Sequence, residues 1–139
     1  MATKKTTQPI YKVAPVWLAV FYGVLLLVFV GFLQRKGVFW ADVPGEIGLH
    51  LSNFAISYLI VAGPGLMNLV LGAPFLAVWL IAGGMVFANL LAEFALTVIN
   101  TKDPLDAVYG IAGTLLAVGL LLLIKCYGLV KIPAKSPKK

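Results

Sequence analysis

The strongest constraint in this sequence is the stretch from Glu46 to Ile99, which contains no Lys or Arg. It is almost entirely apolar, and it is more than twice as long as the roughly 20 residues that one helix needs to cross a hydrocarbon core about 30 Å thick. A soluble protein would place charged residues on the outer face of each helix in such a stretch. The stretch therefore predicts two membrane-spanning helices joined by a tight reversal.

The whole chain has the same character. Of its 139 residues, 61% are hydrophobic and 12% are charged, with a mean hydropathy of +1.00, which is too apolar for a soluble surface. We predict an all-α integral membrane protein, built as a four-transmembrane-helix bundle over residues 14–124. Basic tails precede it (1–13) and follow it (125–139), and no length remains for a soluble catalytic domain.

The expected spans are bounded by Pro, Gly and polar residues. The first covers about 15–33 and opens at Pro15, and the fourth covers about 104–124, with Asp103 as the cap and Pro104 as the first helical residue. The second and third cover about 46–62 and 74–99, with the break between Gly63 and Pro74. The alternative is a second helix that continues past a kink at Pro64.

The basic residues predict the orientation. Three lysines precede the first span and five follow the last, whereas the opposite side has Arg35, Lys36 and Lys102. By the positive-inside rule both termini face the cytoplasm (N-in/C-in), and the first and third loops face outward. The chain is therefore expected to be a multi-pass integral membrane protein. Short flexible basic tails do not make a nucleic-acid interface, so no nucleic-acid partner is expected.

Three ionisable side chains from different helices share one depth near the outer side. His50 lies about one turn into the second span, Glu93 lies about 9 Å of helix rise from the outer end of the third, and Asp106 is in the first turn of the fourth. Polar neighbours accompany them, namely Asn53, Asn89 and Tyr109. We expect these six residues to form an outward-facing polar pocket that binds a ligand.

Each ionisable residue also has a structural interpretation. His50 could form a packing hydrogen bond with Glu93, and Asp106 suits a helix N-terminus through the dipole alone. Glu93 is the strongest functional candidate because a lipid-facing carboxylate costs at least about 2.5 kcal/mol. One His and two carboxylates, with no second His and a lone Cys126, are a poor zinc site, so no metal or other cofactor is expected.

Some of these residues resemble a known family pattern. Glu46, His50 and Phe54 at four-residue spacing, Glu93 in the next span, and Asp106 followed by Gly113 resemble the VanZ-like family of bacterial membrane proteins. The likeness covers roughly residues 46–123. The resemblance implies a cell-envelope protein of the bacterial inner membrane, in a family linked to resistance to the antibiotic teicoplanin. It makes His50, Glu93 and Asp106 the matched polar positions.

The chain departs from that pattern at several positions. Gly110 stands where the family usually has Asn, Leu96 where Gln often follows the Glu, Ala117 where another Gly is common, and Gly48 near a usual Lys. These departures weaken the assignment of a shared ligand.

Three functions compete. The first is a VanZ-like envelope protein whose outward pocket binds a lipid, another amphiphile or a cell-wall-related ligand. The second is a non-catalytic accessory subunit, with other membrane proteins or further copies of itself as partners in addition to membrane lipids. The third is an intramembrane enzyme or proton-coupled carrier that titrates Glu93. The sequence has no catalytic motif, which favours a role other than catalysis.

Overall fold

Four long helices make up most of the molecule. The computed structural model describes residues 9–35, 45–94 and 103–133. The helices are α1 (Pro15–Arg35), α2 (Gly45–Val70), α3 (Leu76–Phe94) and α4 (Pro104–Leu123), and α4 runs on into a π-helical turn, η1 (Ile124–Gly128). All four are long and apolar enough to span a membrane, so the chain is an all-α bundle consistent with a multi-pass membrane protein.

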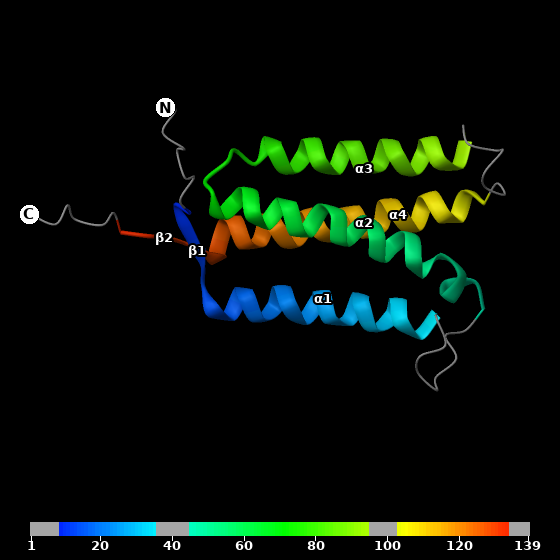
Figure 1. Ribbon diagram of the computed structural model, residues 1–139, viewed down its shortest axis with the longest axis horizontal. Helices are drawn as coiled ribbons and strands as arrows, with labels where there is room; N and C mark the ends of the chain where they lie inside the picture. The colour runs from blue at the N-terminus through cyan, green and yellow to red at the C-terminus, as the bar shows by residue number, and fades with distance from the viewer. Residues whose placement is uncertain (1–8, 36–44, 95–102, 134–139) are drawn as a thin grey trace, which may run out of the picture.

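The helices alternate in direction, with α2 and α4 in the middle and α1 and α3 on either side (Figure 1). Among the described helices, α2 and α4 share the largest interface. Strand β1 and the α2–α3 connection lie at one end, here called the terminal end, and the last turns of α1 and α3 lie with the first turns of α2 and α4 at the other, here called the distal end.

Small residues allow α2 and α4 to approach closely. A Cβ atom added to Gly113 of α4 would overlap the backbone carbonyl of Phe54 in α2. The core beside this contact joins the two helices and consists of fully buried side chains, namely Ala55, Tyr58, Val61, Ala62, Ala117 and Leu121. Lipid is as apolar as leucine, so tight packing of this kind is a main source of helix association in a membrane.

A short β-ribbon joins the two ends of the described chain. Strands β1 (Tyr11–Val13) and β2 (Leu129–Lys131) pair antiparallel, with Tyr11 opposite Lys131 and Val13 opposite Leu129. The Ile132 amide extends the pairing by donating to the Ile10 carbonyl at 2.9 Å, and the Ile10 amide ties the ribbon to the end of α2 by donating to the Val70 carbonyl at 3.0 Å. The prediction of short flexible tails does not hold at residues 11–13 and 129–131, where these strands form.

The structure also corrects the boundary between the second and third spans. Helix α2 continues to Val70 with Pro64 inside it, so the predicted end at residue 62 is wrong and the alternative past Pro64 holds. Pro64 is exposed on the bundle surface, so its ring is accommodated without being buried in the core. The chain then reverses at Gly72, whose φ is +77°, and α3 begins at Leu76 instead of Pro74. The predicted end of the third span at residue 99 lies outside the described residues.

Candidate functional site

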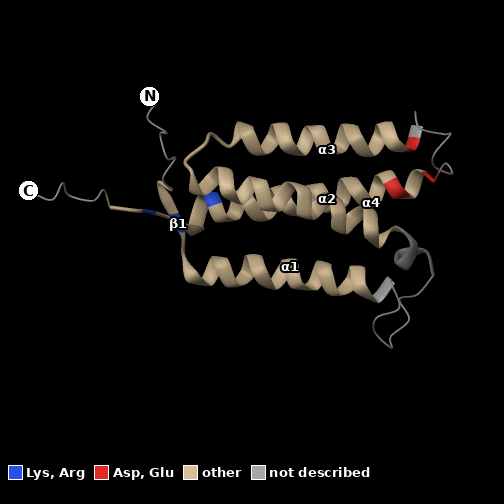
Figure 2. Cartoon of the chain, viewed as in Figure 1, with Lys and Arg blue, Asp and Glu red and all other residues tan. Residues whose placement is uncertain are grey.

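The described charges are separated between the two ends of the bundle. The described lysines lie at the terminal end and the described carboxylates at the distal end (Figure 2). Glu93 lies in the last turn of α3, Asp103 caps α4, and Asp106 lies in the first turn of α4. Three carboxylates therefore surround the N-terminus of α4. The positive end of a helix dipole favours negative charge there, which provides part of the reason why they gather.

His50, Glu93, Asp103, Asp106 and Tyr109 are here called the distal cluster. The contact between His50 and Asp106 lies at its centre. The His50 ring is only 3% exposed, and its Nδ1 lies 2.7 Å from Oδ1 of Asp106 across the α2–α4 interface. The Asp106 side chain is 26% exposed. The predicted meeting of these two residues therefore occurs, whereas the alternative pairing of His50 with Glu93 does not occur.

Asp103 is a member of the cluster that the predicted set lacks. Its Oδ2 lies 3.8 Å from Nε2 of His50, and its Oδ1 accepts a hydrogen bond from the Leu105 amide at 3.1 Å. The second contact is that of a helix cap, which the Asp-Pro pair indicates. The His50 ring therefore lies between two carboxylates, hydrogen-bonded to Asp106 and within ion-pair distance of Asp103.

The Glu93 side chain joins the cluster through the backbone amide of Asp103. It is 3% exposed, and its Oε1 accepts a hydrogen bond from the Asp103 amide. This bond fixes the end of α3 against the cap of α4 and satisfies a donor that the start of a helix leaves free. Glu93 thus positions Asp103 and, among the described contacts, does not touch His50.

The three supporting residues differ in their roles. The Tyr109 ring packs against His50 with ring centroids 5.3 Å apart. Asn89 lies deeper and donates to Ser57 of α2 at 3.0 Å, while its amide packs against Gly110 of α4. Asn53 makes no polar contact with the described part of the chain. Tyr109 therefore belongs to the cluster, Asn89 belongs to a separate interhelical bond, and Asn53 belongs to neither.

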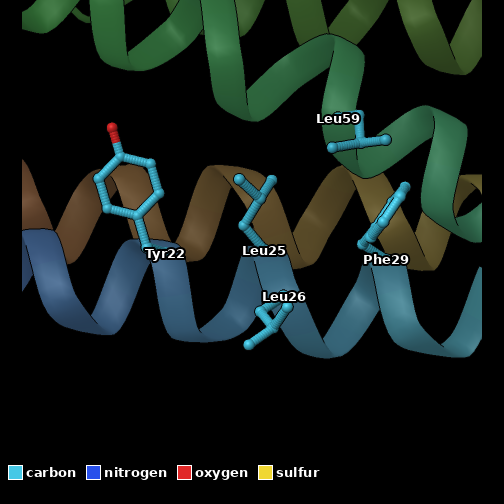
Figure 3. Close-up of a pocket in the computed structure, with 5 residues that line it drawn as sticks. All are labelled: Tyr22, Leu25, Leu26, Phe29 and Leu59. Atoms are coloured by element: carbon cyan, nitrogen blue, oxygen red, sulfur yellow. The ribbon is translucent and has the colours of Figure 1, made fainter.

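An apolar groove lies between α1 and α2 (Figure 3). It encloses about 570 Å³ and is lined by Tyr22, Leu25, Leu26 and Phe29 of α1 and by Leu59 of α2. Leu59 follows His50 by nine residues, or about 13 Å of helix rise. The groove is thus at hydrocarbon depth, on the helix that carries His50 at its distal end.

The described side chains at the distal end do not form a metal-binding group of His, Cys, Asp and Glu. Comparisons of the chain with models of known protein families, with curated protein sequences and with solved structures find no match.

Proposed function

We propose that the chain is a VanZ-like protein of the bacterial inner membrane, with both termini in the cytoplasm, whose distal cluster binds the head group of a lipid, another amphiphile or a lipid-linked cell-wall component. The distal cluster is the set His50, Glu93, Asp103, Asp106 and Tyr109. One observation carries this proposal, namely the buried His50 held against Asp106 at 2.7 Å. Burying ionisable residues in a membrane bundle costs free energy, and such residues usually mark a functional site.

The exposure of the carboxylates supports the same role. The side chains of Asp103 and Asp106 are 43% and 26% exposed, whereas that of His50 is 4% exposed. A head group with hydroxyl or amine donors can reach the carboxylate oxygens from outside, while His50 holds them from within. The apolar groove on α2 offers hydrocarbon depth for the tail of the same molecule.

Site-specific photocrosslinking tests the binding site. A photoreactive phenylalanine replaces Val108, which is 57% exposed beside the cluster, and in a control it replaces Leu115, which is 59% exposed on the same face about 10 Å deeper. We expect position 108 to capture a defined amphiphile from bacterial membranes, and Asp106→Asn to reduce that capture. Equal capture with and without Asp106→Asn would show that the cluster is not the binding site.

A resistance assay tests the family assignment separately. Expression in a teicoplanin-sensitive bacterium should raise the inhibitory concentration of the antibiotic, and His50→Ala should abolish the rise while Leu115→Ala retains it. Resistance that survives His50→Ala at equal protein level would contradict the assignment of this function to the cluster.

An accessory-subunit role is the second candidate, and the exposure of the outer helices favours it. The spans of α1 and α3 are only 11% and 17% buried, which leaves broad apolar faces for lipid or for the helices of a partner. Light scattering of the detergent-extracted protein distinguishes the two roles. A stoichiometric complex with another membrane protein supports the subunit role, and a single chain in its micelle contradicts it.

A further inference from the structure

A polar cavity lies at the terminal end, far from the distal cluster. It encloses about 290 Å³ between the β-ribbon, the α2–α3 reversal and η1. Its lining combines the Tyr11 phenol and the Lys125 side chain with the apolar side chains of Leu69 and Leu129. That volume is at the lower end of the range for small-molecule sites, which suits a head-group fragment better than a whole ligand.

The positive charge in this cavity has no described acidic partner. The Lys125 ammonium lies 4.9 Å from the centroid of the Phe75 ring, so an aromatic face holds it in place. The described carboxylates are at the opposite end of the bundle, where they contact His50 and the start of α4 (Figure 2). An anion entering the cavity would therefore meet an available cation.

The register of the ribbon brings a second lysine to the same face. Residues directly opposite each other in an antiparallel pair project to one side, and neighbours along a strand alternate. Tyr11 pairs with Lys131, and Val13 pairs with Leu129. Because Tyr11 and Leu129 line the cavity, Lys131 projects to the cavity side, while Lys12 projects to the other side.

The cavity is set at the depth of lipid head groups. Trp17 at the start of α1 stacks on Tyr127 in η1, with ring centroids 6.2 Å apart, and such aromatic residues mark the membrane–water boundary. Gly72 forms one wall, where a Cβ atom would lie 2.9 Å from the Ile10 side chain. The β-ribbon and the α2–α3 reversal thus form walls of the cavity at the membrane surface.

We propose that this cavity binds the phosphate of an anionic phospholipid, with the Lys125 ammonium and the Tyr11 hydroxyl as its contacts and Lys131 as an additional charge at its rim. Leu69 and Leu129 provide the apolar side along which the acyl chains leave. The proposal does not depend on the function of the distal cluster.

Native mass spectrometry of the full chain in detergent, with phosphatidylglycerol and phosphatidylcholine of identical chains, measures this binding. We expect one phosphatidylglycerol to bind in preference, and Lys125→Gln to weaken it about fivefold, the factor that a basic side chain near an anionic surface contributes. Lys125→Arg should retain binding because it keeps the charge over Phe75, and Tyr11→Phe should weaken it while leaving the fold intact.

Lys12→Gln is the matched control, since it removes the same charge from the other face of the ribbon. An equal loss in Lys12→Gln and Lys125→Gln would overturn the proposal in favour of diffuse attraction to the basic end. Equal binding of the two lipids would overturn it as well. Displacement of the lipid by an equal concentration of glycerol phosphate would assign the site to a soluble phosphate instead.

Discussion

Gly113→Ala is the sharpest test of the packing between α2 and α4. The added Cβ would overlap the carbonyl oxygen of Phe54 and would lie 3.0 and 3.1 Å from its carbonyl carbon and Cα. All three atoms belong to the backbone of α2, so no rotamer change relieves the contact. The two helices must separate, along the largest helix interface in the described bundle.

The expected cost follows from that separation. Overpacking of a close-packed core costs about 1–3 kcal/mol, and a gap of about 0.5–1 Å forfeits a quarter to a half of each dispersion contact it opens. Because the obstacle is backbone, we expect Gly113→Ala to lower the free energy of unfolding by about 3 kcal/mol, the upper end of that range. This corresponds to about a hundredfold change in the unfolding equilibrium.

Unfolding in mixed micelles with increasing dodecyl sulfate, followed by far-ultraviolet circular dichroism, measures the difference. Two glycines provide a graded control series. At Gly65 the added Cβ meets the side chain of Leu121, which can rotate, so a smaller loss is expected. At Gly119 it meets nothing within 4 Å, so stability should be unchanged or slightly higher. A Gly113→Ala protein as stable as Gly119→Ala would refute the close approach of α2 and α4.

Further variants test three polar contacts. A double-mutant cycle of His50→Ala and Asp106→Asn should give a coupling of about 0.5–3 kcal/mol, and additive losses would show that the pair is not formed. Glu93→Gln should keep an acceptor for the amide of Asp103, the cap of α4, whereas Glu93→Leu should cost about 1–3 kcal/mol and speed hydrogen exchange at Asp103; identical exchange in both would contradict the bond. Asn89→Leu should cost about 0.6 kcal/mol, the mean for interhelical hydrogen bonds in membranes, and an unchanged unfolding midpoint would argue against its bond to Ser57.

Local sequence signals were sufficient to predict where a helix begins when its start depends only on its own residues. Pro15 and the pair Asp103-Pro104 correctly predict the starts of α1 and α4, because proline suits the first turn of a helix and aspartate caps it. Pro64 was misleading, because its effect depends on whether the surroundings accept the ring. In α2 the ring lies on the exposed surface, and the helix continues.

Contacts between distant segments could not be read from the sequence. Depth along the helices correctly brings His50 and Asp106 to one level, but the rotation of each helix decides which side chains meet. That rotation makes Asp103, instead of Glu93, the second acid beside His50. The β-ribbon has the same origin, since three-residue strands carry no period of their own and form only once the bundle brings residues 11–13 and 129–131 together.

The pairing of Tyr11 with Lys131 closes the chain between these two residues into one large loop that contains the four helices. Helix α1 has little packing of its own, since its span is 11% buried, yet it is tethered at its start to the end of α4. Closing a loop in this way raises the local concentration of α1 beside the rest of the bundle, so a weak interface suffices to keep it docked. A force that pulled residues 9 and 133 apart would first break the hydrogen bonds of Ile10 with Ile132 and Val70, and would then open the ladder one pair at a time from Tyr11 and Lys131.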